Sequence, residues 1–313
     1  MMNYNNQKYP LVSIISINFN NPGITSDLLK SLRLISYQNV EIIIVDNASS
    51  QGNVDLLKEQ YPEILLLKSI KNLGFAGGNN LGIAQAKGKY ILLLNNDIEV
   101  KPDFLEPLVA KLESDNSIGA VSPKIKFFHQ PDIIQFAGQA PINHYTMRSF
   151  GYGYKAVDKG QFDKDSITHF LHGAAMMVPK SVIQKVGLMP ECYFLFYEEL
   201  DWCSSIKRAG FQLWYVHNST VLHKESMSVG KMSETKTYYM NRSRFIYLRR
   251  NISGIKFMVA LFYLILVSVP KNSFSLLISG KFGHFKAYMR AINWHLMHLF
   301  SKEIHTNQSL NYS

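Results

Sequence analysis

The sequence predicts an α/β fold in which helices cover both faces of a doubly wound, mostly parallel sheet, followed by a helical C-terminal extension. In the first 125 residues, short apolar runs alternate with segments of helical periodicity. The runs show little alternation of polar and apolar residues, which is typical of strands buried on both faces. The predicted strands are 11–17, 41–45, 64–67 and 90–94, and the predicted helices between them are 25–34, 53–60 and 76–86.

The second half of the chain is less regular. Residues 138–153 are rich in turn formers and are interpreted as an insertion, whereas 171–178 form a further apolar run ahead of helices at 180–186 and 199–210. Gly210 suits the position just after the second helix, because glycine readily adopts a left-handed conformation. We expect one domain over residues 1–250, with halves of about 10–125 and 126–250, and a tail over 251–313.

Composition limits the class of protein. With 47% hydrophobic residues, a chain of 313 residues can bury a large core. The two cysteines, Cys192 and Cys203, are too few for a disulfide framework or a zinc site. Residues 1–10 are polar and lack the apolar run of a signal peptide. These features favour the cytoplasm.

Positive charge is concentrated toward the C-terminus. From Lys224 onward, 13 Lys and Arg stand against three Glu, which accounts for the whole formal charge of +10. A neutral body with a basic tail indicates an anionic partner, either lipid headgroups or nucleic acid. The same tail carries the apolar run 257–269, which is unusual in a nucleic-acid-binding arm. An anionic membrane surface is therefore favoured, and no nucleic acid is expected.

The apolar segments of the tail predict contact with the membrane surface. The run 257–269 has 13 residues before Pro270 interrupts it, short of the roughly 18–20 that cross a bilayer. The stretch 282–300 mixes aromatic and aliphatic residues with Lys, Arg and His, as in helices of the headgroup layer. We expect a peripheral location at the inner face of the membrane. A flap on the main domain, or a homo-oligomer contact through these helices, is the alternative.

Polar residues gather where the predicted strands end. Asn18 follows the first strand, 46–50 the second and 95–97 the fourth. Because the carboxyl ends of parallel strands meet at one edge of the sheet, where ligands of such folds bind, these side chains are expected to share a site.

Asp97 is the candidate metal ligand at this edge. A carboxylate there can hold Mg²⁺ or Mn²⁺ against a diphosphate, because these ions share oxygen ligands with substrate phosphates. The metal would stabilise the charge of a leaving nucleoside diphosphate. Alternatively, residues 95–97 only cap the helix that begins near Pro102, and Asp46 to Ser49 form a simple turn.

The segment 72–80 places glycines and amides at a helix N-terminus, where backbone N–H groups favour an anion. Its spacing does not match the dinucleotide-binding fingerprint, and the later segment 82–90 does not match the P-loop, so neither class is expected.

The acidic group Glu198-Glu199-Leu200-Asp201 follows the aromatic run 193–197. The simpler interpretation is that these acids stabilise a helix start through its dipole. Against aromatic walls, one carboxyl group can instead have a raised pKa suited to accepting a proton from an alcohol. His223, after the apolar run 215–222, is either structural or an additional metal ligand.

Taken in order, these segments resemble the family 2 inverting glycosyltransferases of the GT-A fold, in particular the bacterial rhamnosyltransferase-like branch that acts in surface polysaccharide assembly. The resemblance covers about residues 11–250. It implies a nucleotide site in which Asn18 and Asp46 contact the nucleoside and Asn47 and Ser49 lie near the ribose. The further nucleotide-site residues that it implies are Gly74, Asn79 and Asn96.

The resemblance also implies a catalytic half. Residues 95–97 look like the family's D-x-D motif with Asn as the first residue, which leaves Asp97 as the charged ligand, and His223 matches a histidine that completes metal binding in some members. The acidic group looks like E-D-x-D, in which the second acid, here Glu199, is the general base. The acceptor side would comprise His172, Gly173 and Trp202.

The expected reaction is a single displacement at the anomeric carbon of a nucleotide diphosphate-sugar, dTDP-rhamnose or a UDP-sugar. Glu199 would deprotonate a hydroxyl of a glycan or lipid-linked acceptor, with Glu198 or Asp201 as alternative bases. Two other classes are a nucleotidyltransferase, which needs a basic loop after the first strand, and a non-catalytic scaffold. Asn18 to Gly23 contain no Lys or Arg, which disfavours the former.

Overall fold

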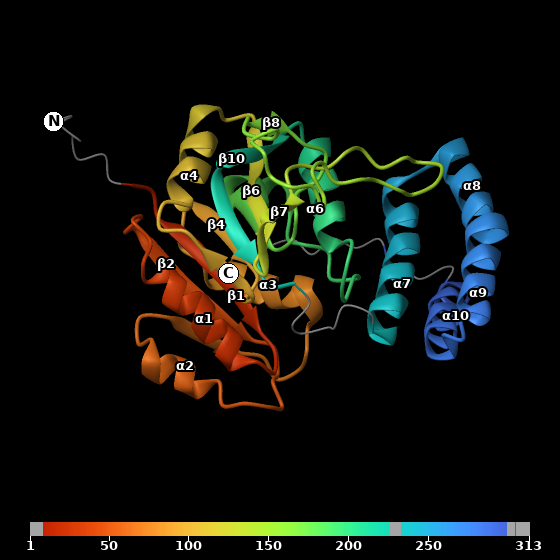
Figure 1. The fold of residues 1–313 in the computed structure, drawn as a ribbon, viewed down its shortest axis with the longest axis horizontal. Coiled ribbons are helices and arrows are strands. Elements are labelled where there is room, and N and C mark those ends of the chain that lie inside the picture. Colours follow the sequence, from red (N-terminus) through yellow and green to blue (C-terminus); the bar gives the residue numbers. More distant parts are fainter. Residues whose placement is uncertain (1–8, 226–232, 299–303, 305–313) are drawn as a thin grey trace.

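The computed structural model describes residues 9–225, 233–298 and 304. The first eight residues and the end of the predicted tail, from 299 on apart from 304, lie outside this range. Figure 1 shows a sheet domain with helices packed on it and, beside it, a layer of helices from the C-terminal part of the chain.

The strands form one mixed sheet in the order β3-β2-β1-β4-β9-β6-β10-β5, with β7 beside β6 and β8 beside β10. The strands predicted from the first 125 residues are confirmed as a parallel group, since β1 pairs in parallel with β2 and β4, and β2 with β3. The second half adds β9, antiparallel to β4 and β6. The strands are β1 (Val12–Asn18), β2 (Val40–Asp46), β3 (Leu65–Lys68), β4 (Tyr90–Leu94), β5 (Ile98–Val100), β6 (Ile118–Phe127), β7 (Gln130–Phe136), β8 (Ser166–Ile167), β9 (Ala175–Pro179) and β10 (Gln212–His223).

Helices cover both faces of the sheet, close to their predicted positions. The first follows a bend at residues 19–20, with Pro22 in its first turn and Asn21 accepting a hydrogen bond from the Ile24 N–H as N-cap. The helices of the domain are α1 (Pro22–Leu32), α2 (Asp55–Gln60), α3 (Gly74–Gln85), α4 (Leu105–Ser114), α5 (Lys180–Val186) and α6 (Glu198–Arg208).

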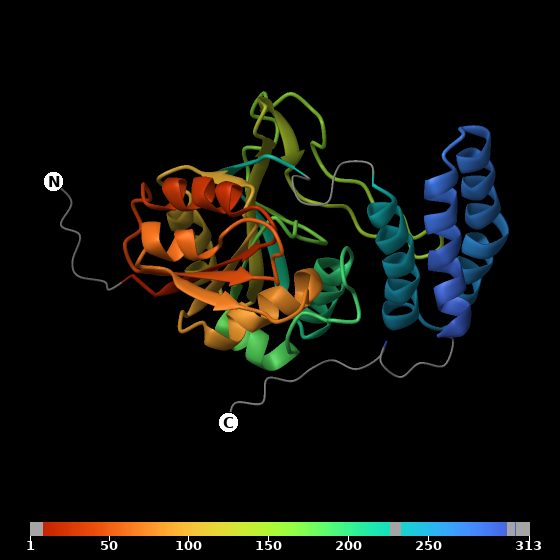
Figure 2. The same ribbon diagram turned by 90° about the horizontal axis from the view of Figure 1, so that it is seen from below.

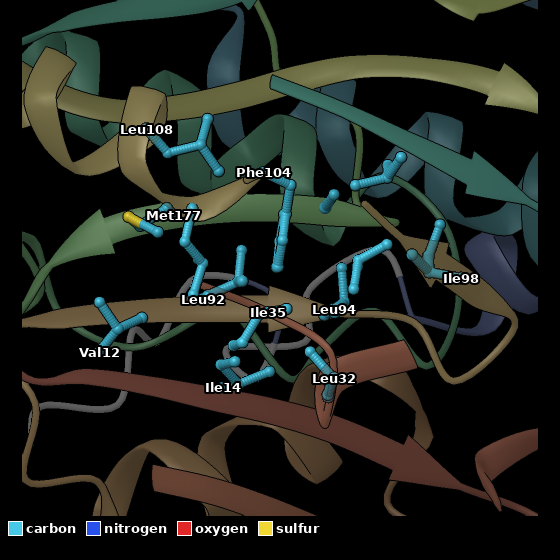
Figure 3. Packing of buried hydrophobic residues seen from close by; sticks show 14 of the residues in the cluster. Val12, Ile14, Leu32, Ile35, Leu92, Leu94, Ile98, Phe104, Leu108 and Met177 are labelled. Atoms are coloured by element: carbon cyan, nitrogen blue, oxygen red, sulfur yellow. The ribbon is translucent and has the colours of Figure 1, made fainter. Parts of the chain in front are cut away.

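Successive residues of the central strands enter two separate cores. Ile14 and Leu92 belong to the cluster that packs against α1, α2 and α4, part of which is shown in Figure 3. Their neighbours Ile15 and Leu93 belong to the cluster on the other face, with residues of α3, α5 and α6. Because both faces are covered, both side-chain directions are apolar, which explains the unbroken hydrophobic runs in the sequence.

The C-terminal helices stand side by side next to the sheet domain, as Figures 1 and 2 both show. α10 packs along α7 and α9. These helices are α7 (Glu234–Asn251), α8 (Gly254–Tyr263), the π-helical turn η1 (Leu264–Ser268), α9 (Val269–Ile278) and α10 (Phe282–Met297).

The prediction that Pro270 ends the apolar helix is wrong. The helix runs without a break over Gly254–Ile278, 25 residues in all. Its ladder has already shifted in η1, where the Val269 N–H donates to the carbonyl oxygen of Leu264. Pro270, which lacks an N–H, therefore falls at the first turn of α9, where the irregular ladder accommodates it. By length and composition this helix alone, among the described residues, is able to cross a membrane.

Candidate active site

A cavity of about 670 Å³ lies at the carboxyl ends of β1, β2 and β4, beside the start of α7. Its size is that of a small-molecule site, and it lies at the edge of the sheet where the sequence predicts one. The predicted site residues that line it are Asn47, Gly74, Asn79, Asn96, Asp97, His172, Gly173, Glu198, Glu199 and His223.

Asn18, Asp46 and Ser49 do not line the cavity but support its floor. The Asp46 carboxylate accepts hydrogen bonds from Asn18 Nδ2 at 2.8 Å and from Ser49 Oγ at 2.6 Å. Thr25 Oγ1 donates to Asn18 Oδ1 and accepts from Asn96 Nδ2, at 2.8 and 3.0 Å. This network ties together the ends of β1, β2 and β4. A direct contact of Asn18 or Asp46 with a nucleoside stays a prediction.

Asn47 holds the glycine-rich segment against the cavity. Its Oδ1 accepts from the Leu73 N–H at 2.8 Å, and its Nδ2 donates to the Gly74 carbonyl at 2.9 Å. Gly74 has φ +70°, and a Cβ there would lie 2.3 Å from the carbonyl oxygen of Phe194. That oxygen accepts from the Phe75 N–H at 2.9 Å. Gly74 therefore allows a close backbone contact between the start of α3 and the loop that precedes the acids.

Asp97 and His223 meet because β5 and β10 pair antiparallel, with Ile98 opposite His223. The Nε2 atom of His223 lies 3.1 Å from Asp97 Oδ1, and both residues are buried. His223 Nδ1 lies 2.7 Å from Gln135 Oε1, and in the tautomer in which Nδ1 donates to this oxygen, Nε2 can bind a cation beside Asp97. Two electron-pair donors at this distance require a proton or a cation between or beside them.

The pair fits a divalent cation that is completed by its substrate. Among the described residues there is no group of three or more His, Cys, Asp or Glu that could hold a metal. Mg²⁺ and Mn²⁺ sites with one or two protein ligands are completed by water and substrate phosphates. Asp97 and His223 both line the cavity, so together they would supply two ligands of such a site and leave its other positions to substrate and water.

His172 and Gly173 lie between the Asp97–His223 pair and the acids at the start of α6. The His172 ring lies edge-on to that of His223, with centroids 5.9 Å apart, and its Nδ1 accepts from the Ala174 N–H at 3.1 Å. Burial, with the nearby His223 adding to it, lowers the pKa of His172 to about 3, so the ring is neutral at pH 7. A Cβ on Gly173 would lie 3.5 Å from Glu199 Cγ. This segment packs directly against Glu199.

Glu198 and Glu199 both line the cavity from the first turn of α6. The Oε2 atom of each is buried and has no hydrogen-bond partner among the described residues. Burial raises the pKa of Glu199 to about 7. Burial and the neighbouring Glu199 raise the pKa of Glu198 well above its ordinary value. A carboxyl group that titrates near neutral pH beside a ligand cavity is suited to general acid–base chemistry.

Two predicted site residues lie in the protein interior instead. The carboxylate of Asp201 accepts from Tyr193 Oη at 2.9 Å and from Arg250 Nε, and it does not line the cavity. Trp202 is buried and its Nε1 donates to the Gly187 carbonyl at 2.9 Å. Its assignment to the acceptor side is wrong, as is Asp201 as an alternative base, because one turn further along α6 the side chains face the domain core.

Several cavity residues were missed from the sequence. Gln135, which orients His223, comes from β7, and no spacing marked it. Phe194 stacks on Tyr239 with ring centroids 4.9 Å apart, and Lys236 and Tyr239 line the mouth from α7. The i, i+3 spacing of the last two was the one available signal, since it places them on one helix face.

A mixed sheet that carries a strand-end carboxylate, a partner histidine and paired buried acids around one cavity defines a glycosyltransferase of the GT-A fold. The fold is shared with the mannosyltransferase PcManGT from Pyrobaculum calidifontis, solved in complex with GDP-Man and Mn²⁺, at a TM-score of 0.57 and 16% identity over 95% of this chain and 83% of that one. Residues 13–187 match the Glycosyl transferase family 2 domain, and the chain belongs to this family.

Two curated relatives have similar sequences over most of their length. The low-salt glycan biosynthesis hexosyltransferase Agl10 of Haloferax volcanii is 25% identical over 243 residues, 75% of this chain and 74% of its own. The N-acetylglucosaminyl-diphospho-decaprenol L-rhamnosyltransferase of Mycobacterium tuberculosis is 23% identical over 249 residues, 72% and 80% of the two chains. Membership of this family favours glycosyl transfer over the nucleotidyl transfer that the sequence left open.

Gly74→Ala tests the close contact between α3 and the loop before the acids. It should lower the free energy of unfolding, measured in urea, by clearly more than the about 1–2 kcal/mol expected for a left-handed alanine alone. Gly210→Ala is the matched control, because Gly210 has φ +92° with nothing within 4 Å of its Cβ position. Equal losses for the two variants would show that the Phe194 contact imposes no constraint.

Proposed function

We propose that this protein is a metal-dependent, inverting glycosyltransferase that moves a sugar from a nucleotide diphosphate-sugar to a hydroxyl group of a glycan or lipid-linked acceptor, in cell-surface polysaccharide biosynthesis. One observation carries the proposal: Asp97 and His223 line the same cavity as Glu198 and Glu199. A donor diphosphate and an acceptor hydroxyl can therefore be held on either side of one anomeric carbon.

The cation is Mn²⁺ or Mg²⁺, held by Asp97 and His223. When bound, it supplies positive charge that stabilises the departing nucleoside diphosphate. The Mn²⁺ named with GDP-Man in the PcManGT structure supports this assignment by similarity of fold. Gln135 keeps the His223 ring in the tautomer that a metal ligand needs.

Glu199 is the general base. Because its pKa is about 7, a large share of Glu199 is ionised at neutral pH and accepts the proton of the acceptor hydroxyl. Burial and the neighbouring Glu199 also raise the pKa of Glu198 well above its ordinary value, because two negative charges side by side in this buried pair are unfavourable. The nucleotide leaves from the face opposite the acceptor, and a single displacement inverts the anomeric configuration.

The names of the relatives support a hexosyl donor and a glycan product. One is named for glycan biosynthesis, and the other for rhamnosyl transfer to a diphospho-decaprenol carrier. We accordingly assign dTDP-rhamnose or a UDP-sugar as the donor class and a glycan or a lipid-linked sugar as the acceptor class.

Glu199→Gln should lower turnover of the donor and acceptor pair by about 10²–10⁴, because the amide cannot accept a proton. Donor binding, measured by calorimetry with Mn²⁺, should persist. In the unsubstituted protein, kcat/KM should fall as the pH drops below 7, since Glu199 becomes protonated.

Glu198→Gln serves as the control for Glu199→Gln, because it removes a carboxyl group from the same helix turn. Near-normal turnover in Glu199→Gln together with a loss in Glu198→Gln would move the base to Glu198. If the unsubstituted protein shows neither donor hydrolysis nor sugar transfer, the protein is instead a non-catalytic scaffold.

Removal of divalent cations should abolish transfer, and Mn²⁺ or Mg²⁺ should restore it. Asp97→Asn should require a higher Mn²⁺ concentration for half-maximal rate, whereas Asp103→Asn, at an exposed position nearby, should behave like the unsubstituted protein. Activity that survives thorough chelation would contradict the assignment of Asp97 and His223.

We also propose that the C-terminal helices dock the protein on the cytoplasmic face of an anionic membrane. Ile255, Phe262 and Leu266 lie on one face of the helix and are 75%, 57% and 66% exposed. Basic side chains at Lys256, Lys271 and Lys281 are exposed along the same helices. An apolar face flanked by Lys matches the chemistry of a bilayer with acidic headgroups.

Phe262→Glu with Leu266→Glu should abolish sedimentation with phosphatidylglycerol vesicles, because the charges cannot enter the acyl layer. Leu34→Glu, at a side chain that is 71% exposed on the sheet domain, should leave sedimentation unchanged. Vesicles of phosphatidylcholine alone should bind more weakly, and salt should weaken binding. A stable dimer in solution that ignores vesicles would show that these helices are a subunit interface instead.

A further inference from the structure

The loop that delivers the acids to the cavity has an unfavourable backbone. Residues 192–197, here named the aromatic loop, end in Phe196 with φ +66° and Tyr197 with φ +74°. Bulky residues rarely adopt this left-handed conformation, and two in succession persist only where the surroundings hold them. They lie directly before Glu198, so their conformation sets the direction in which α6 starts.

Three successive residues of α7 hold this loop. Arg242 Nη2 donates to the Cys192 carbonyl at 3.0 Å, at the start of the loop. Ser243 Oγ donates to the Leu195 carbonyl at 2.8 Å, and Arg244 Nε donates to Tyr197 Oη at 3.2 Å. Ser243 is fully buried, so its hydroxyl bond is shielded from water.

None of the three α7 residues lines the cavity, whereas Phe196, Glu198 and Glu199 all do. They therefore act on the reaction only through the loop. The opposite end of α6 is joined to α7 separately, by a bond of 2.6 Å from Arg208 Nη1 to Asn251 Oδ1.

We propose that Ser243 and Arg244 are positioning residues that hold Phe196 and Tyr197 in the left-handed conformation and so aim Glu199 at the acceptor hydroxyl. The proposal rests on the proposed function in naming Glu199 as the base. It assigns to α7 a catalytic contribution that is separate from the docking of the tail.

Arg242, in the same segment of α7, is also contacted by residues of α10. His295 Nε2, on α10, donates to the Arg242 carbonyl at 2.9 Å, and the Arg242 guanidinium lies 4.2 Å from the centroid of the Trp294 ring. α10 therefore contacts the segment of α7 that binds the aromatic loop.

Ser243→Ala and Tyr197→Phe test the proposal, because each variant removes one hydroxyl group from the contacts between α7 and the aromatic loop. Amide hydrogen exchange over residues 195–199 should become faster, while exchange in β1 and β4 stays unchanged. A displaced base should lower kcat by about 10-fold to 10²-fold with the donor KM unchanged. The acidic limb of the kcat profile should move to lower pH, because Glu199 becomes more hydrated.

Asn251→Ala is the matched control, since it removes a bond between the same two helices away from the loop. If Ser243→Ala and Tyr197→Phe match it in exchange, kcat and pH profile, the proposal is overturned. Faster exchange throughout the sheet would likewise reduce the effect to general destabilisation. If Glu199→Gln is active while exchange at 195–199 still responds to the two variants, the assignment of the base is wrong, but the role of α7 in holding the aromatic loop is supported.

Discussion

The pairing of β9 with both β4 and β6 is the constraint on which the site depends. β4 is the last strand of the parallel group, and β9 covers its open edge in antiparallel register from Tyr90↔Pro179 to Leu94↔Ala175. The segment that carries His172 and Gly173 leads directly into β9, and the Asn95 N–H donates to the Ala174 carbonyl at 2.9 Å. This pairing therefore joins the two halves of the sheet and places Asp97 and His223 beside the acids.

Helix α6 presents two kinds of acid within one turn, and their surroundings separate their roles. Asp201 is buried against Arg250 and Tyr193, so its negative charge is compensated and the residue anchors the helix. Glu198 is buried and Glu199 is half-buried, the Oε2 atom of each has no hydrogen-bond partner among the described residues, and desolvation raises the pKa of both. Burying these two carboxyl groups without a partner lowers the stability of the fold. Such a cost is expected at a functional site.

Much of the fold followed from local patterns, because apolar runs and helix signals report directly on buried strands and amphipathic helices. Topology alone placed the strand ends at Asn18, Asp46 and Asp97 at one edge of the sheet, whereas the acids at 198 and 199 were assigned to the site through the resemblance to the family motif. Residues whose roles depend on tertiary contacts were not predictable. The sequence around Trp202 is the same whether its helix face contacts a ligand or the core. Gln135 contacts His223 only because β7 brings the two residues together. The prediction at Pro270 was wrong because a π-helical turn accommodates the proline, and no residue type signals such a turn in the sequence.

The position of β10 bears on the order in which the site assembles during folding. This strand comes last in the chain, yet it lies inside the sheet, between β6 and β5. It brings His223 to Asp97 across a long stretch of sequence, and contacts of that kind form late because their loops must first close. A chain in which β10 is missing or has not yet paired with β5 has no Asp97–His223 pair, so this pair is present only once the sheet is complete.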